Sequence, residues 1–313
     1  MSYDASFVGL TILDISGRPI VAIPEKSNVG FIEEIRLNPA GTASGSLINA
    51  AKLGLECLPI AAVGNDEKGN FILDYYSRME IDCSMIQRTD DAPTSATILP
   101  IRSNGDRPGW HCRGASDHLF VKEDDFDKVC DAKVLHHGGT GLLNAMDHGQ
   151  SAKLLKYAKA KGLTVTFDLI APDTETVELL KPILPHVDYF MPSMEEAEIL
   201  SGESEPSDIV KFFMDLGVGT CVLKWGPKGS YVANVDGHFR VPAYEVEVSD
   251  TTGCGDSYCG GFIAGLVKGF DLENSCRLGT AASALVATAL GSDAGVIDFE
   301  HTVEFMQSGR ILE

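Results

Sequence analysis

The residues best suited to chemistry form one short segment, Asp250-Thr251-Thr252-Gly253-Cys254-Gly255-Asp256, which runs into a stretch of helical period. A Gly-x-Gly loop at a helix start offers unpaired backbone N–H groups at the positive end of the helix dipole, which favours an anion. If the anion is a transferring phosphoryl group, Asp256 is placed to accept a proton from an attacking hydroxyl. The amides of Gly253, Cys254 and Gly255 would then stabilise the developing charge. Helix capping is the alternative explanation for these residue types.

The chain is strongly acidic. Its 313 residues include 25 Lys+Arg and 45 Asp+Glu, which gives a net charge of −20. This charge repels the phosphates of nucleic acids and anionic lipids, so we expect neither a nucleic acid nor a membrane as partner. No apolar run reaches the ~20 residues that a bilayer span requires, and the acidic N-terminus lacks the basic residues of a secretory signal. We therefore expect a cytoplasmic protein whose dispersed cysteines are reduced.

Short apolar runs rich in Val, Ile and Phe alternate with longer segments of helical period through most of the chain. This alternation predicts an α/β fold with a Rossmann-like parallel sheet and helices on both faces. The expected strands are Ala5–Ile12, Cys57–Val63, Lys133–His137, Thr164–Asp168, Asp188–Met191 and Cys221–Lys224. The expected helices are Ser46–Leu53, Lys68–Met79, Gln150–Lys161, Met194–Leu200, Ile209–Leu216, Ser257–Lys268 and Cys276–Leu290.

Strand patterns separated by turn residues break this alternation within residues 14–38 and 95–115. In the second stretch, Asn104-Gly105 between two apolar runs is typical of a hairpin. We therefore predict a small β-sheet lid over the site. The α/β core that binds nucleotide and substrate would then comprise residues 1–13, 39–94 and 116–313.

The segment from Asp250 to Asp256 resembles the C-terminal signature of the ribokinase-like family of carbohydrate kinases, also called the PfkB family, which reads D-T-x-G-A-G-D. Similarity to the family extends over nearly the whole chain in the expected order. The matching landmarks are Gly9 and Asp14, Ala40–Gly45, Gly105-Asp106-Arg107 with Arg113, Met191–Glu198, and Lys224–Gly229. The resemblance implies a kinase with ATP as donor and Mg²⁺ as divalent cation.

The resemblance also implies individual roles. Asp256 would be the catalytic base, and Gly253, Cys254 and Gly255 would form the anion hole. The residues expected at the substrate, from the resemblance and from their place in the lid, are Asp14, Gly41, Gly45 and Arg113.

Nucleotide and cation roles follow from the same match. Glu196 would organise Mg²⁺ through water, and Asp250 matches a position that faces a monovalent cation, K⁺, in some members. The residues expected along the nucleotide are Lys224, Gly226, Gly229, Thr251, Ala281 and Ala284.

The sequence departs from the family pattern at three places. Cys254 stands where the family has Ala, which should be harmless because the loop works through its backbone, although it leaves an oxidisable thiol beside the phosphate. Ser193 replaces an Asn, so the metal and phosphate network loses one amide. Ala40 and Gly45 stand where the family has Gly and Asn, and the missing Asn side chain would reach substrate hydroxyls. This last departure leaves the substrate class open.

These observations predict an ATP-dependent kinase that phosphorylates a hydroxyl of a monosaccharide or sugar acid. The alternatives are a nucleoside kinase on the same fold and a catalytically silent, ligand-binding regulator. The sequence has no G-x-x-x-x-G-K-[ST] motif and no G-x-G-x-x-G after the first strand, which excludes a P-loop kinase and disfavours a dehydrogenase. The expected partner is a small-molecule sugar, and the edges of an exposed lid sheet would allow a homodimer.

Overall fold

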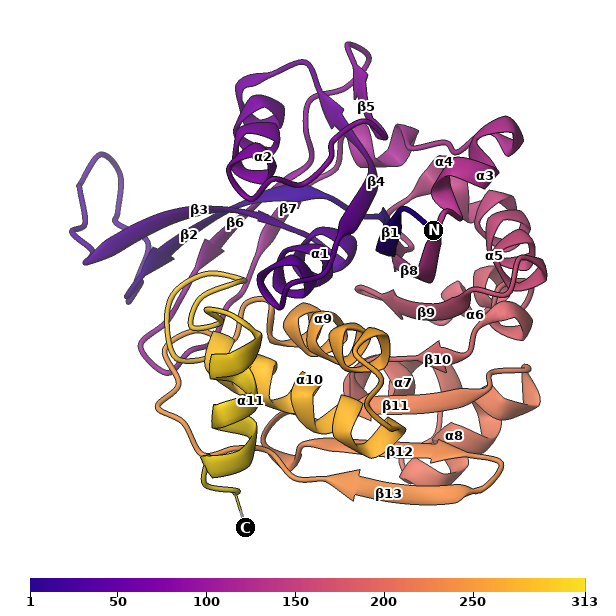
Figure 1. Cartoon of the computed structure of the whole chain (residues 1–313). Coiled ribbons are helices and arrows are strands. Elements are labelled where there is room, and N and C mark those ends of the chain that lie inside the picture. The colour runs from indigo at the N-terminus through magenta and orange to yellow at the C-terminus, as the bar shows by residue number, and fades with distance from the viewer. Residues whose placement is uncertain (313) are drawn as a thin grey trace.

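The structure is a computed structural model that describes residues 1–312. Within these residues, nine strands form a large sheet in the order β13-β12-β11-β10-β9-β8-β1-β4-β5, and four strands form a small sheet (Figure 1). The strands of the large sheet are β1 (Tyr3–Gly9), β4 (Cys57–Gly64), β5 (Ile86–Thr89), β8 (Ala132–Thr140), β9 (Thr164–Leu169), β10 (Tyr189–Phe190), β11 (Thr220–Lys224), β12 (Ser230–Asn234) and β13 (Gly237–Val241).

The large sheet is parallel from β5 to β11, whereas β12 and β13 run antiparallel at one edge. Its central strands are apolar runs because both faces are covered. All eight residues of β4 are buried, for example. The predicted Rossmann-like sheet is therefore confirmed.

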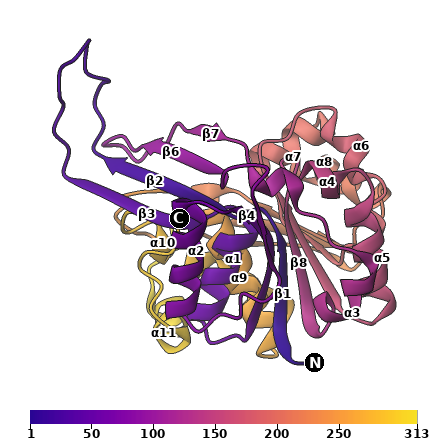
Figure 2. The ribbon, with the colours of Figure 1, turned by 90° about the horizontal axis from the view of Figure 1, so that it is seen from above.

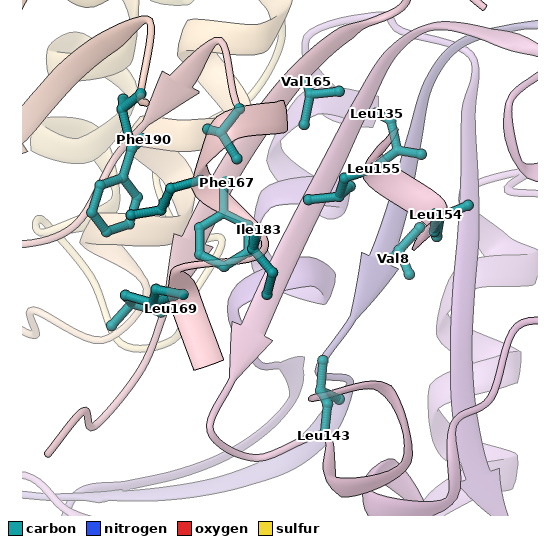
Figure 3. Close-up of a cluster of buried hydrophobic side chains, with 14 of the residues drawn as sticks. Val8, Leu135, Leu143, Leu154, Leu155, Val165, Phe167, Leu169, Ile183 and Phe190 are labelled. Carbon is teal, nitrogen blue, oxygen red and sulfur yellow. The ribbon is translucent and has the colours of Figure 1, made fainter. Parts of the chain in front are cut away.

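Helices cover both faces of the large sheet (Figure 2). The helices are α1 (Thr42–Lys52), α2 (Glu67–Arg78), α3 (Phe126–Val129), α4 (Asn144–Asp147), α5 (Gln150–Ala160), α6 (Thr176–Leu180), α7 (Met194–Ser201), α8 (Pro206–Asp215), α9 (Cys254–Val267), α10 (Leu272–Val286) and α11 (Phe299–Ser308). One buried cluster, which includes Phe167 and Phe190, joins the sheet to α5, α7 and α8 (Figure 3). A second cluster joins the other face to α1, α2, α9, α10 and α11.

The small sheet continues from the carboxyl end of β1. It contains β2 (Ile12–Arg18), β3 (Glu34–Ala40), β6 (Ala96–Pro100) and β7 (Trp110–Cys112), in the order β3-β2-β6-β7. The sequence predicted one strand over Ala5–Ile12, and this was wrong. The chain leaves the large sheet at Gly9, whose φ of +136° and contact with Gly138 require a glycine.

The predicted hairpin around Asn104-Gly105 is confirmed, because β6 and β7 pair antiparallel on either side of it. The connection is longer than a tight turn, since β6 ends at Pro100 and β7 begins at Trp110. The antiparallel hairpin β12–β13 and helix α11 were not predicted, although Asp236-Gly237 is a hairpin turn signal.

Helix α9 packs backbone to backbone between α1 and α10. A Cβ atom at Gly260 would lie 2.6 Å from the carbonyl oxygen of Ser46 in α1. A Cβ atom at Gly261 would lie 2.9 Å from the Cα atom of Gly279 in α10. These glycines each lower helix propensity by ~1 kcal/mol relative to Ala, but they let three helices approach closely. The approach fixes the position of the segment that begins α9.

We expect Gly260→Ala to lower the free energy of unfolding by about 1–3 kcal/mol, because the new methyl group overpacks the contact with α1. Gly260→Val should cost more, since the side chain is larger. Urea unfolding followed by circular dichroism measures both. At an unpacked helix position the change to Ala would instead stabilise, so a gain in stability would contradict this packing.

Candidate functional site

A cavity of about 690 Å³ opens where β9 and β11 end, between the small sheet and the first turn of α9. This is the usual place for a ligand in an open α/β sheet, outside the carboxyl ends of the strands. Many of the residues singled out in the sequence line it together, namely Asp14, Gly41, Glu196, Lys224, Gly226, Gly229, Thr251, Gly253, Cys254, Gly255, Asp256 and Ala284.

The turn before α9 leaves the N-terminus of this helix without a side-chain cap. Gly253 has a φ of +75° and begins α9 without any side-chain cap, so the first helical turn faces the cavity. The N–H of Cys254 donates to the carbonyl oxygen of Thr251 at 3.3 Å, which leaves the amides of Gly255 and Asp256 as the free donors of this turn. An uncapped helix N-terminus of this kind attracts an anion.

Asp250 holds this turn in place through hydrogen bonds. Its carboxylate accepts hydrogen bonds from the N–H and hydroxyl of Thr252, at 2.8 and 2.7 Å, and from the N–H of Gly291 at 3.0 Å. The side chain is fully buried and does not line the cavity. Both carboxylate oxygens are therefore engaged within the protein.

Asp256 lies in the first turn of α9 with its carboxyl group in the cavity. Burial, together with the nearby Asp168 carboxylate, raises the pKa of Asp256 to about 7, although Lys224 and Arg107 oppose the shift. A carboxyl group with such a pKa can exchange a proton near neutral pH. This is the property that a general base needs.

Asp168, at the carboxyl end of β9, was missed by the sequence analysis. Its Oδ2 lies 2.6 Å from Nζ of Lys224, and the two side chains are only 2% and 12% exposed. Burial alone would lower the pKa of Lys224, but the Asp168 carboxylate outweighs it and raises that pKa, so the ammonium stays charged. The Nζ atom of Lys224 lies beside Gly255, 3.2 Å from the position that a Cβ atom of Gly255 would take. An aspartate that ends an apolar strand was the available signal.

Ser193 and Glu196 form a reciprocal capping box at the start of α7. The hydroxyl of Ser193 accepts from the N–H of Glu196 at 3.2 Å, and Oε2 of Glu196 accepts from the Ser193 N–H and hydroxyl at 2.8 Å each. Burial, and the charge of Asp168, raise the pKa of Glu196. Ser193 thus orients the Glu196 carboxyl group at the cavity wall.

The cavity wall formed by β2 and the start of α1 contains polar atoms that lack hydrogen-bond partners. Oδ1 of Asp14, on β2, and the hydroxyl of Thr42, at the start of α1, are buried and have no hydrogen bond within residues 1–312. Burial raises the pKa of Asp14 to about 7. Since buried polar atoms are normally hydrogen-bonded, this wall is suited to a ligand rich in hydroxyl groups. Thr42 was not singled out in the sequence.

Gly45 does not line the cavity, and the structure gives it another purpose. A Cβ atom there would lie 2.6 Å from Oδ2 of Asp256, so the glycine makes room for that carboxyl group. Arg113 also lies outside the lining. Its Nε donates to Oδ2 of Asp117 at 2.8 Å. Ala281 is buried in α10 and does not line the cavity, whereas Ala284 does.

Arg107 supplies positive charge from the small sheet. It lies in the loop between β6 and β7, lines the cavity, and makes no hydrogen bond or ion pair within the part of the chain that the structure describes. Its charge acts on both Asp14 and Asp256 and lowers their pKa values against the effect of burial. Arg107 is thus a free guanidinium group at the junction of the two walls.

Cys254 is not the reactive thiol that the sequence suggested. Burial raises its pKa to about 12, and its Sγ donates to the carbonyl oxygen of Ser283 at 3.5 Å. Because the thiolate is the species that is oxidised, this thiol should be inert at neutral pH.

Comparison with known proteins agrees with this geometry. The sequence profile described as "pfkB family carbohydrate kinase" matches residues 5–298, so the chain belongs to the PfkB family of carbohydrate kinases. It is therefore a phosphotransferase that acts on a sugar hydroxyl.

Relatives with assigned activities are similar over most of the chain. A 2-dehydro-3-deoxygluconokinase of Thermoproteus tenax is 30% identical over 84% of this chain and 83% of its own length. An ATP-dependent 6-phosphofructokinase of Thermoanaerobacterium thermosaccharolyticum is 26% identical over 83% of this chain and 82% of its own. The fold matches an Escherichia coli protein called "Ribokinase II", solved with ATP and Mg²⁺, with a TM-score of 0.83 and 24% identity over 97% of this chain and 99% of that one.

No helix among residues 1–312 has the length and apolar character needed to cross a membrane.

We expect Asp256→Asn to raise the melting temperature at pH 8 and to leave it nearly unchanged at pH 4. The pKa of Asp256 is about 7 in the folded chain and 3.8 ordinarily, so the folded state binds its proton more tightly. Wild-type stability therefore falls as the pH rises between these two values, whereas a neutral amide incurs no such loss.

Differential scanning fluorimetry at several pH values measures this effect. The exposed Asp236→Asn, in the turn between β12 and β13, is the matched control and should show no pH-dependent gain. A lower melting temperature of Asp256→Asn than of wild type at pH 8 would contradict the prediction.

Proposed function

We propose that this chain transfers the γ-phosphoryl group of ATP to a hydroxyl of a monosaccharide or sugar acid. The observation that carries the proposal is the place of Asp256: it lies in the first turn of an uncapped helix, beside the Lys224 ammonium and across the cavity from Asp14. A base, an anion site and unpartnered hydroxyl-binding atoms thus share one cavity. The named relatives, which act on a phosphorylated ketose and on a deoxy sugar acid, support this substrate range.

In the proposed reaction, Oδ1 of Asp14 and the hydroxyl of Thr42 bind hydroxyl groups of the acceptor and orient it. The reacting hydroxyl oxygen attacks the γ-phosphorus while its proton passes to the Asp256 carboxylate. The bond from the γ-phosphorus to the bridging oxygen breaks, and ADP leaves. The amides of the first turn of α9, with Lys224 and Arg107, stabilise the charge on the transferring group.

The nucleotide would lie along the turn Gly226–Gly229 and reach toward Thr251 and Ala284, where the cavity wall becomes apolar. Glu196 fits a role toward Mg²⁺ through water, since no cluster of three metal-ligating side chains occurs among residues 1–312 and Mg²⁺ keeps most of its hydration shell. When bound, Mg²⁺ would neutralise phosphate charge. Asp250 lies outside the cavity and accepts three hydrogen bonds within the protein, so we assign it to holding the turn in place rather than to K⁺.

The acceptor is identified by acceptor-dependent release of ADP from Mg-ATP, across pentoses, hexoses, ketoses, aldonic and keto-deoxy acids, and nucleosides. Turnover should occur with a sugar or sugar acid, and Asp256→Asn should lower it ~10²-fold or more, because the general base is lost. Binding of ATP should persist in this variant, because the amide is isosteric.

The panel also separates the alternatives. A nucleoside as the best acceptor would establish the nucleoside kinase in place of the sugar kinase. ATP binding without turnover on any acceptor would favour the silent regulator. Near-normal turnover in folded Asp256→Asn would exclude Asp256 as the base.

We also propose that the small sheet associates with a second copy of the chain. The sheet and the loop that joins β2 to β3 carry exposed apolar side chains: Ile35 on β3 at 65% and Trp110 on β7 at 58% exposure, with Val29 at 77% and Phe31 at 95% in the loop. Together with open strand edges, such a patch is typical of an interface.

Light scattering after size exclusion should therefore show a homodimer that Phe31→Glu converts to a monomer, because the new charge would be buried in the interface. Val235→Glu, equally exposed but in the turn between β12 and β13, is the matched control and should remain dimeric. A monomeric wild type, or dissociation by both substitutions alike, would contradict the proposal.

A further inference from the structure

A buried ionic network that the transfer mechanism does not use lies beside the cavity. Its centre is Asp293, which is only 1% exposed. Oδ2 of Asp293 lies 2.7 Å from Nζ of Lys52 and accepts from the hydroxyl of Tyr75 at 2.6 Å. Oδ1 accepts from Arg36 at 3.2 Å and from the amide of Asn38 at 2.8 Å. The network joins the small sheet, α1 and α2 to the loop that follows α10.

This loop, residues 290–293, rests directly on the turn that begins α9. The Gly291 N–H donates to Asp250, which braces the turn. The Cα atom of Ser292 lies 2.6 Å from where a Cβ atom of Gly253 would be, so no space separates loop and turn. A shift of the loop must therefore move the amides of the anion site.

On its other side the loop is attached to strand β3 of the small sheet. Arg36 donates to the carbonyl oxygen of Leu290 at 2.7 Å, and the Ser292 hydroxyl donates to that of Pro39 at 3.2 Å. Asn38, which binds Asp293, is the cross-strand partner of Asp14 in the β2–β3 pair. The wall that presents Asp14 and the turn that presents Gly253 are thus joined through one buried carboxylate.

We propose that Asp293 is a positioning residue that couples the small sheet, with the acceptor site at Asp14, to the anion site at Gly253. The identity of the two ligands rests on the function proposed above. Arg36 and Asn38 of the small sheet both donate to Oδ1 of Asp293, so a shift of the sheet is passed through this oxygen to the loop that carries Asp293. Occupation of one site then favours the arrangement that the other site requires, and the coupling is reciprocal.

The two tryptophans of the chain allow a test that needs neither acceptor nor turnover. In a Trp225→Phe background, Trp110 on β7 is the remaining tryptophan and reports on the small sheet. Titration with Mg-AMP-PNP, a non-hydrolysable ATP analogue that binds on the anion side, should shift the emission of Trp110. Calorimetry under the same conditions measures binding itself.

Arg36→Met and Lys52→Met form a matched pair, because each removes one cation from Asp293 but only Arg36 lies on the small sheet. Arg36→Met should abolish the Trp110 response while AMP-PNP still binds. Lys52→Met should retain the response, although its melting temperature falls. A purely structural network would instead make the two variants behave alike.

With an acceptor from the panel, wild type should bind AMP-PNP at least ~5-fold more tightly when acceptor is present. The ratio of AMP-PNP affinity with and without acceptor should fall to ~1 in Arg36→Met and in Asp293→Asn. In both variants kcat should fall, while the KM for acceptor should change less. A ratio of 1 in wild type, a silent Trp110 in spite of AMP-PNP binding, or equal responses of the matched pair would overturn the coupling.

The two proposals fail separately. Turnover without a Trp110 response would leave the kinase assignment intact and remove the coupling. A Trp110 response that depends on Arg36, without turnover on any acceptor of the panel, would keep the coupling and remove the proposed substrate range. Absence of AMP-PNP binding in wild type would overturn both.

Discussion

The close approach of α9 to α1 and α10 is the constraint on which the site depends. Glycines at 260, 261 and 279 remove the side chains that would hold these helices apart. Because α9 is fixed along its length, its first turn is held rigidly even though no side chain caps it. The same closeness explains Gly45, since any larger residue there would displace the carboxyl group of Asp256. The bare helix end and the carboxyl group of Asp256 are thus positioned by backbone packing.

Charge is the second organising factor. Five acidic residues, Asp14, Asp168, Glu195, Glu196 and Asp256, line one cavity with two cationic side chains, Lys224 and Arg107. Burial in a negative surrounding raises the pKa values of Asp14 and Asp256 to about 7. Burial thus opposes the charged form of both carboxyl groups.

The small sheet contributes more than a cover for the cavity. It carries Asp14 on β2 and Arg107 in the loop between β6 and β7, and through β3 it is attached to the loop that supports the anion site. Segments far apart in the sequence, around residues 36, 52 and 293, meet at a single buried carboxylate. Such a junction links the two substrate walls mechanically.

The sequence by itself determined the fold class and most of the central strands and helices, because apolar periodicity is a local property. It also indicated the Asp250–Asp256 segment, because a glycine loop that runs into a helix with an acid is chemically distinctive over a few residues. Only the tertiary structure brought Asp168 to Lys224, placed Arg107 and Thr42 at the cavity, and moved Arg113 away from it. Likewise, the purpose of Gly45 and the partners of Asp293 depend on contacts between residues more than 200 positions apart. Contacts between such distant residues depend on how helices and sheets pack, so a local sequence pattern cannot predict them.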